Sequence, residues 1–215
     1  MDKPLQQPSM YAPPHYMAAD PAAIVRAHPF ALLVTPGETG TFATSTPIFF
    51  ETDDDTSPLV GHMAARNPHA GALAAGQPAL VVFWGPHAYI SSRWYKAMPQ
   101  VPTWNYLQAQ VRGVLEPIDD REGRIAVLRR TAEVLERSGE PPWTLDQAPE
   151  GRIDTLLPHI RSFRIRVETI EGATKLSQKH PAADRVRVIE GLLAQGDDDA
   201  VEIARLMAAL GIEDA

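Results

Sequence analysis

Residues 106–115 read YLQAQVRGVL, and their side chains alternate between two kinds. Leucine, alanine, valine and glycine occupy the odd positions from 107 to 115, whereas glutamine and arginine occupy positions 108, 110 and 112. Successive side chains of a β-strand point to opposite faces, so one face of this segment suits a core and the other suits water. The stretch therefore predicts a long, half-buried antiparallel strand.

More strands are predicted on both sides of this one. Residues 160–170 alternate in the same way, and shorter apolar or threonine-rich runs occupy residues 30–34, 41–50, 59–63 and 79–84. Pro47 predicts an edge or a bulge in its run, because proline lacks the N–H that a ladder needs. At Gly85-Pro86 we expect a turn, after which residues 88–91 pair back or continue.

The fold class follows from this order of elements. Strands and helices do not alternate as in parallel sheets, and no GxGxxG or Walker loop is present. The chain has 20 prolines, about twice the average usage, which argues against a helix bundle. We therefore expect a mainly β (α+β) fold, a small β-barrel with peripheral helices.

Five helices are predicted from their caps and their apolar spacing. The clearest covers residues 119–138, where Asp119 and Glu122 resemble a capping box. The others are expected at residues 21–28, 68–76, 182–194 and 198–210. As domains we expect an extended arm at residues 1–14, a barrel domain at residues 15–178 that includes the helix 119–138, and a C-terminal helical segment at residues 179–215.

Charge and composition exclude several classes of function. Acidic side chains outnumber basic ones by 27 to 20, and the net charge is −7. A wholly basic nucleic-acid-binding protein is therefore not expected, although residues 152–166 and 175–187 are locally basic and could serve one phosphate or a weak DNA contact. The acid is concentrated at residues 51–55 and after residue 197. Cysteine is absent, which excludes thiol nucleophiles, disulfides and cysteine-ligated metals.

Location and metal binding are predicted from what the sequence lacks. No uncharged apolar run approaches the roughly 18–20 residues that cross a bilayer, and residues 1–8 have no apolar signal-peptide region. We therefore expect a cytoplasmic protein without a membrane partner. The seven histidines form no HxxxH or HxH pair, so no metal site is predicted. No side chain stands out as a catalytic acid, base or nucleophile.

Three segments carry side chains that suit a ligand. Residues 61–68, GHMAARNP, lead from a predicted strand into a helix, where Arg66 and free helix amides would suit a phosphate. Residues 84–106 hold three tryptophans and three tyrosines, which could line a planar cofactor, form a dimer interface or fill a core. Residues 172–178, GATKLSQ, combine a cation, a hydroxyl and an amide that suit a sugar or a phosphate. Taken alone, the first and third segments favour ordinary loop residues, whereas the aromatic segment suits a ligand or interface and a core equally well.

Together these segments resemble the motifs of the PaiB family, in family order over roughly residues 10–193. The matching motifs are YAPPHY at 11–16, HPFA at 28–31, VT at 34–35, GHMAARNP at 61–68, GPHAYIS at 85–91, WY at 94–95, VPTWNY at 101–106 and KLSQ at 175–178. That family is similar to FMN-binding split barrels of the pyridoxamine-phosphate-oxidase type. The resemblance implies an FMN-binding split β-barrel, a homodimer with the flavin at the subunit interface, and the family label of negative transcriptional regulator.

Two positions depart from the family pattern. Ser45-Thr46-Pro47 stands where the family usually has a His-Leu-Pro-like block, and Lys179 stands where the last motif usually ends in asparagine. Both blocks are expected close to the flavin. Backbone contacts along residues 41–50 would survive the first change, whereas a histidine side-chain contact would not.

The resemblance implies residues for the FMN phosphate. We expect Arg66, together with the helix start at Asn67, to bind the phosphate, because a dianion needs charge-assisted donors. Lys175 would reinforce this contact, and His62 would line the same site.

Other residues are implied for the rest of the flavin. Ser91, Ser177 and Gln178 would serve ribityl or ring-edge polar groups. Trp104 and Asn105 would flank the isoalloxazine ring, from the same chain or from the partner chain.

The function expected from the resemblance is that of a flavin-dependent transcriptional regulator or sensor. An FMN-dependent oxidoreductase, such as an NAD(P)H:flavin reductase or a small-molecule oxidase, is the alternative, and there the flavin would carry the redox chemistry. A family member that binds no flavin and acts as a dimeric scaffold is the third possibility. Steady NAD(P)H oxidation would favour the enzyme, and a salt-sensitive promoter footprint would favour the regulator.

Overall fold

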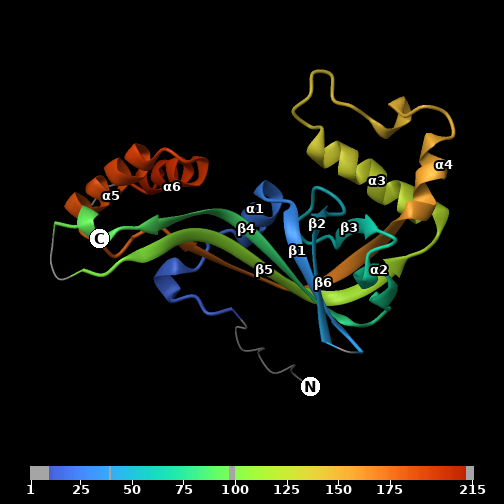
Figure 1. The fold of residues 1–215 in the computed structure, drawn as a ribbon, viewed down its shortest axis with the longest axis horizontal. Coiled ribbons are helices and arrows are strands. Elements are labelled where there is room, and N and C mark those ends of the chain that lie inside the picture. The colour runs from blue at the N-terminus through green and yellow to red at the C-terminus, as the bar shows by residue number, and fades with distance from the viewer. Residues whose placement is uncertain (1–9, 39, 97–99, 212–215) are drawn as a thin grey trace. The chain divides into compact units, whose positions relative to one another are not determined.

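The computed structural model describes residues 10–38, 40–96 and 100–211. Six strands form a closed barrel in the order β1-β2-β3-β6-β5-β4 (Figure 1). This confirms the expected α+β class, a small β-barrel with added helices. The strands are β1 (Phe30–Gly37), β2 (Gly40–Phe50), β3 (Leu59–Ala64), β4 (Pro78–Ile90), β5 (Thr103–Ile118) and β6 (Ile160–Lys175).

Strand β5 contains the alternating stretch, and its odd positions are buried as predicted. Ala109, Val111 and Leu115 are completely inaccessible to solvent. Gly113 lies on the same face, and a Cβ atom there would be 2.2 Å from the carbonyl oxygen of Arg166 in β6. Only glycine permits so close an approach of the two strands.

Strand β2 exchanges one neighbour for another at Pro47. Residues 40–47 pair with β1, ending at the Phe30–Pro47 pair, and residues 48–50 pair with β3, beginning at Ile48 and Gly61. The ladder therefore changes partners where proline offers no N–H. The expected edge or bulge at this residue is instead a change of partner within a closed barrel.

Strand β4 runs without interruption through Gly85 and Pro86, so the predicted turn is wrong. Before these residues the odd positions are buried, as at Phe83, and after them the even positions are buried, as at Ala88 and Ile90. Gly85 and Pro86 are both buried. The dipeptide therefore shifts the alternation by one residue, as a bulge does, and does not end the strand.

All five predicted helices are present and two of them differ in detail, and the structure adds the short helix α4 (Arg152–Leu156), which was not predicted. Helix α3 is capped by Asp120, whose Oδ1 accepts a hydrogen bond from the amide of Gly123 at 2.7 Å. The expected cap, Asp119, instead pairs with Arg161. Helix α2 ends four residues before Gly76. The α-helices are α1 (Pro21–Ala27), α2 (Pro68–Ala72), α3 (Arg121–Leu135), α4 (Arg152–Leu156), α5 (Ala182–Gln195) and α6 (Asp198–Ala209), and short 3-10 turns are η1 (Pro14–Tyr16), η2 (Ser92–Trp94), η3 (Leu145–Gln147) and η4 (Leu157–His159).

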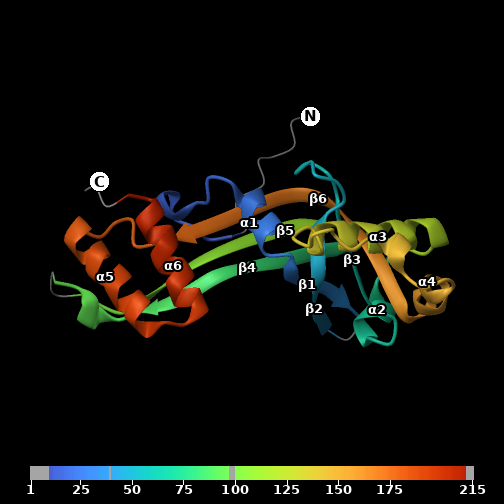
Figure 2. The ribbon, with the colours of Figure 1, turned by 90° about the horizontal axis from the view of Figure 1, so that it is seen from above.

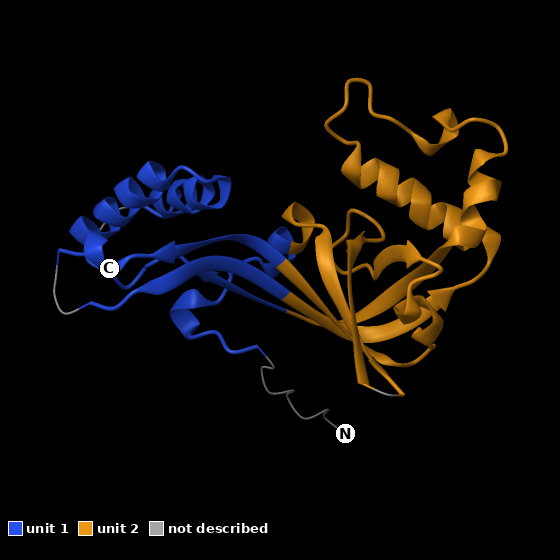
Figure 3. Ribbon diagram, viewed as in Figure 1, with its two compact units in different colours: residues 1–24, 84–109, 171–215 blue, residues 25–83, 110–170 orange. Residues whose placement is uncertain are grey.

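The chain divides into two compact units (Figure 3). Unit 1 comprises residues 1–24, 84–109 and 171–215, and unit 2 comprises residues 25–83 and 110–170. Strands β4, β5 and β6 each contribute residues to both units. The predicted division at residues 14 and 178 stays a proposal, and residues 1–9 of the predicted arm lie outside the described residues.

Each unit has its own core. In unit 1, α5 and α6 lie side by side (Figures 1 and 2) and bury Leu192 and Met207 against Ala88 and Ile90 of β4. In unit 2, α3 packs Val127 against Phe49 and Val60 of the barrel, and Ile118 completes this cluster. No helix in the described part of the chain is long and apolar enough to cross a membrane.

Candidate functional site

Unit 1 presents an exposed aromatic face on β4 and β5. Three large aromatic side chains on this face keep about half of their surface accessible, namely Trp84 (52%), Trp104 (51%) and Tyr89 (45%). The ring of Trp104 lies in the middle, 5.7 Å from the His87 ring and 6.0 Å from the Tyr89 ring between centroids. Exposed aromatic side chains of this size mark a surface that binds a planar ligand or another protein.

The aromatic face is hollowed. A concavity of about 710 Å³ is lined by Trp84, His87, Trp104, Tyr106 and Gln108. Its volume falls within the range of ligand pockets, and its mainly aromatic lining with a few polar groups is typical of them. The geometry suits a flat aromatic ring whose edge makes polar contacts.

A histidine and a carboxylate meet beside this face. His87 Nε2 lies 3.6 Å from Asp199 Oδ2 at the start of α6, and both side chains are about half exposed. An imidazole oriented by a carboxylate is the arrangement that general acid–base chemistry uses. The pair therefore places a group that could hold or move a proton next to the aromatic concavity.

Asn105 and Ser177, both predicted for the flavin, lie in the core of unit 1. Asn105 is 0% and Ser177 is 1% exposed. The Asn105 amide donates to Ser177 Oγ at 3.0 Å and to the Met207 sulfur at 3.4 Å. Ser177 has φ of 60°, a left-handed conformation. In this structure the two side chains satisfy each other, and their role toward a flavin stays a prediction.

Three more predicted residues of unit 1 make local contacts. Lys175 Nζ donates to Thr103 Oγ1 at 2.5 Å and lies over the Tyr16 ring, and its burial lowers the pKa of its ammonium group. Gln178 accepts from the Leu176 amide at 2.8 Å and donates to a backbone carbonyl at 2.6 Å. Ser91 caps η2. The three side chains therefore order the ends of β4 and β6.

The remaining predicted residues, His62, Arg66 and Asn67, belong to unit 2. Asn67 caps α2 by accepting the amide of His69 at 3.0 Å. Because α2 has five residues and starts with Pro68, few free amides remain there for an anion. Arg66 is exposed, and no hydrogen bond or ion pair engages its guanidinium among the residues that the structure describes. The phosphate prediction therefore rests on the Arg66 side chain.

The role of His62 toward a phosphate stays a prediction. Its imidazole lines a mainly apolar cavity in unit 2, and its burial lowers the pKa of the ring. Thr46, in the block that departs from the family pattern, donates its hydroxyl to the His62 carbonyl and so joins β2 to β3. Thr46 thus has a structural contact, and the residue that stands in place of the family histidine is the neighbouring Ser45.

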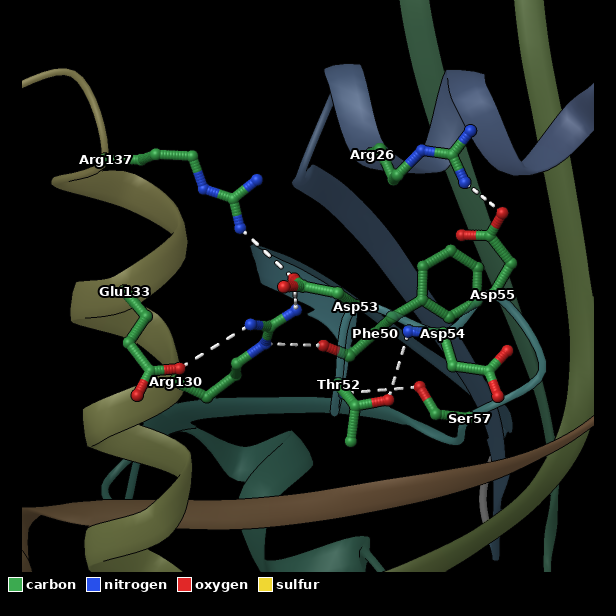
Figure 4. Close-up of polar contacts among 10 residues, drawn as sticks. All are labelled: Arg26, Phe50, Thr52, Asp53, Asp54, Asp55, Ser57, Arg130, Glu133 and Arg137. Atoms are coloured by element: carbon green, nitrogen blue, oxygen red, sulfur yellow. Dashed lines mark hydrogen bonds and ion pairs between the residues drawn. The ribbon is translucent and has the colours of Figure 1, made fainter.

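The acidic loop after β2 pairs with arginines of unit 2 (Figure 4). Asp53 accepts from Arg130 at 2.9 Å and from Arg137 at 3.3 Å, and these contacts lower the pKa of its carboxyl group. Arg26 of α1 pairs with Asp55 of the same loop. Asp53 and Asp55 of the acidic run therefore pair with three arginines of unit 2.

Most other arginines of unit 2 are paired in the same way. The pairs are Arg121–Asp154, Arg129–Asp146, Arg161–Asp119, Arg164–Glu51 and Arg166–Glu168. The locally basic stretch at residues 152–166 therefore has little uncompensated charge for a nucleic acid.

Residues 84–106 are dense in aromatic side chains, and the sequence predicts Ser91, Trp104 and Asn105 from this stretch for the flavin. This prediction missed Trp84, His87 and Tyr106, which share the concavity with Trp104. The signal that could have found them is the alternation of two neighbouring strands, which sets every second side chain on one face.

Comparisons with known proteins identify the family. A family model described as "Putative FMN-binding domain" matches residues 10–169. The protein named "Protease synthase and sporulation protein PAI 2" from Bacillus subtilis is 33% identical over 201 residues, which cover 92% of this chain and 96% of that protein.

Two solved structures share the fold. The flavocytochrome Anf3 of Azotobacter vinelandii superposes with a TM-score of 0.55 at 14% identity, covering 75% of this chain and 70% of that chain. The FAD and heme binding protein of Mycobacterium smegmatis superposes with a TM-score of 0.50 at 17% identity, covering 72% and 69%. At these identities the likeness concerns the fold alone.

Proposed function

Because the chain belongs to the PaiB-like family of FMN-binding domains, we propose that it is a homodimeric flavin-dependent regulator or sensor. FMN is the cofactor of this family. When bound, a flavin supplies redox chemistry and a ring whose state a partner can sense. The protein's own residues would bind the flavin, orient it and shield it from water.

The observation that carries the proposal is the aromatic concavity of unit 1. The rings of Trp84, Trp104 and Tyr106 offer stacking surfaces, and His87 and Gln108 offer polar contacts at its rim. This donor set fits an isoalloxazine, which is planar and has hydrogen-bonding groups on one edge. Arg66 is proposed separately as a ligand of the phosphate, because its guanidinium is exposed and without a described partner.

A second copy of the chain is proposed to cover the aromatic face. Trp84, Tyr89 and Trp104 expose far more aromatic surface than single scattered apolar residues would. Tryptophan and tyrosine are the residue types that concentrate binding energy at protein interfaces. Sedimentation equilibrium of the wild-type chain is expected to show a dimer, and W84S/W104S is expected to shift it toward the monomer. A monomeric wild-type chain at micromolar concentration would contradict this part.

The proposal of a regulatory role is supported by the name of the Bacillus subtilis relative, "Protease synthase and sporulation protein PAI 2", which refers to sporulation. The paired arginines of unit 2 give no support to a strong direct DNA contact. We therefore propose that any DNA contact is weak. Footprinting of the protein's own promoter fragment, with and without FMN, is expected to show protection that is lost at moderate salt.

The pair His87–Asp199 favours a second candidate, an FMN-dependent oxidoreductase. In that case His87 would donate or accept a proton beside the ring, and Asp199 would orient its imidazole. Steady NAD(P)H oxidation by the FMN-loaded protein, lost in H87A and reduced in D199N, would support the enzyme. If NAD(P)H oxidation does not exceed that of free FMN, the oxidoreductase is contradicted and the regulator or sensor remains the proposed function.

A further inference from the structure

Three arginines of unit 2 surround one cavity of about 250 Å³ beside the acidic loop (Figure 4). Arg26 comes from α1, Arg130 comes from α3, and Arg137 comes from the turn that follows α3. The apolar side chains of Phe49 and Phe50 line the same cavity. Guanidinium groups that converge from separate elements form the arrangement with which proteins hold a carboxylate or a phosphate.

Arg130 is held in position by contacts that no ligand supplies. Its side chain is 13% exposed, and its Nε donates a hydrogen bond to the Phe50 carbonyl at 2.9 Å. Its Nη1 lies 3.5 Å from Glu133 on the same helix. A guanidinium group that the backbone already fixes loses little further freedom when an anion binds to its remaining nitrogen.

A carboxylate occupies the place between Arg130 and Arg137. Asp53 Oδ1 accepts a hydrogen bond from Arg130 at 2.9 Å and another from Arg137 at 3.3 Å. Asp55 of the same loop pairs with Arg26. The two guanidinium groups of α3 and its following turn are therefore close enough to share one anion, and Asp53 engages both of them with a single oxygen atom.

The Asp53 carboxylate is a ligand that another anion could replace. Its side chain is 80% exposed, and ion pairs between exposed groups contribute little because water and salt screen them. The loop also has hydrogen bonds that do not involve this side chain. The amide of Asp54 donates to Thr52 Oγ1 at 3.2 Å, and the amide of Thr56 donates to Asp54 Oδ1 at 2.8 Å. Asp53 can therefore turn into solvent while the loop keeps these bonds.

The cavity favours a phosphate group over a second carboxylate. When Asp53 turns away, three guanidinium groups and the Asp55 carboxylate still line the cavity, and Glu133 stays beside Arg130. A phosphate monoester carries a charge of about −1.5 to −2 and three strong acceptor oxygens, so it can offer a separate oxygen to each arginine. The cavity is smaller than the roughly 300–1,000 Å³ of sites that enclose a whole ligand. The rest of the molecule would therefore remain in solvent.

We propose that this cavity binds the phosphate group of a small phosphate monoester, which replaces the Asp53 carboxylate between Arg130 and Arg137. Asp53 then acts as an internal competitor of the ligand. The site does not depend on the proposed flavin function, and Arg66, which is proposed for the FMN phosphate, is not among the residues that line it.

Two matched probes test the chemistry by calorimetry on the full chain, with and without FMN. We expect phenyl phosphate to bind saturably. Benzoate should bind at least about tenfold more weakly, because a carboxylate gains nothing over the Asp53 side chain that it must replace. Absence of saturable phenyl phosphate binding, or equal affinity for benzoate, would overturn the proposal. Competition between FMN and phenyl phosphate would also overturn it, because the cavity would then hold the FMN phosphate.

Two arginine variants test the location. R137Q is expected to weaken phenyl phosphate binding at least about tenfold. Arg129 of α3 pairs with Asp146 and lines a neighbouring cavity but not this one, so R129Q is the matched control and should bind as the wild type does. Because the Arg137 side chain is 66% exposed, R137Q should fold normally by circular dichroism. Equal affinities of R137Q and R129Q would refute the site.

Two variants of the acidic loop test the internal competition. D53N removes the competing carboxylate, and we expect it to bind phenyl phosphate about threefold more tightly than D54N does. D54N removes the same charge from the same loop without an arginine contact in the described structure. Equal affinities of D53N and D54N would show that Asp53 does not compete with the ligand and would contradict the proposal.

Discussion

The side-chain amide of Asn105 donates a hydrogen bond to Ser177 Oγ across 3.0 Å, in a place that solvent does not reach. This contact joins the start of β5 to the turn after β6 inside unit 1. The family resemblance implies a role for both residues at the flavin, whereas the structure gives them a role in the core.

N105A separates these roles. Removing the amide leaves the Ser177 hydroxyl without its partner in a buried place, and we expect the free energy of unfolding to fall by about 1–3 kcal/mol. Urea denaturation of the flavin-free protein measures this loss. S177A removes the other partner of the hydrogen bond. We expect the double variant N105A/S177A to lose less stability than the sum of the two single variants, because the effects of residues in contact are not additive. Unchanged stability together with weaker FMN binding would instead assign Asn105 to the flavin.

R66A is expected to weaken FMN binding by at least about 1.5 kcal/mol, the lower figure for a hydrogen bond to a charged group, which is about tenfold in Kd. Because the Arg66 side chain is exposed and has no partner within the described residues, the melting temperature of the flavin-free protein should stay the same. Riboflavin, which lacks the phosphate, should bind both proteins equally. Equal FMN affinity of the variant and the wild type would remove Arg66 from the site.

Acid is expected to destabilise the fold through His69. This buried side chain lies between two hydroxyls, with Nε2 2.9 Å from Thr35 Oγ1 and Nδ1 2.9 Å from Thr44 Oγ1. Burial lowers its pKa. The unfolded chain therefore binds the proton more readily, and the stability from the neutral ring, fully present above about pH 6.5, is lost as the pH falls toward the folded pKa.

The measurement is the unfolding free energy between about pH 7.5 and pH 5, in the wild type and in H69N. Burial also lowers the pKa of His62 and of His180, so these residues act in the same direction. H69N should therefore show a smaller slope with pH, not a flat line. Replacement of the exposed His15 by asparagine serves as the control. Identical slopes in H69N and the wild type would contradict the assignment.

The acidic loop should lower the affinity of unit 2 for polyanions. Asp53 contacts the guanidinium groups of Arg130 and Arg137. D53N therefore releases Arg137 to meet another anion and leaves Arg130 with Glu133 as its carboxylate partner. We expect D53N to elute from heparin at higher salt than the wild type. D54N removes the same charge from the same loop without an arginine contact in the described structure, so it serves as the matched control. Equal elution of D53N and D54N would show that net charge alone sets the retention.

The sequence predicted the barrel because alternation and caps are local signals. The strand at residues 106–115 and the two C-terminal helices stand where the pattern placed them. The continuous β4 could not be predicted in this way. Gly85-Pro86 is a strong turn signal, and only pairing within a closed barrel shows that the strand continues through it.

Part of the candidate site could likewise be predicted from the sequence, and part could not. Trp104 was selected from the sequence and lies on the aromatic concavity. The burial of Asn105 involves α6, whose Met207 sulfur accepts a hydrogen bond from the Asn105 amide across 102 residues of the chain. The sequence could not show which residue caps α3, because the adjacent Asp119 and Asp120 have the same side chain. In the structure Arg161 of β6 pairs with Asp119, and Asp120 is the cap.

The aromatic face of unit 1 is the surface that we propose binds FMN. This proposal is tested most directly by titrating flavin-free protein with FMN and following the flavin absorbance, in the wild type, W104A and W143A. Trp143 is an exposed tryptophan of unit 2 and serves as the matched control. We expect a saturable spectral change in the wild type and in W143A, and an affinity for FMN reduced at least about tenfold in W104A. A wild-type chain that leaves the FMN spectrum unchanged, or a W104A variant that binds FMN as the wild type does, would contradict it.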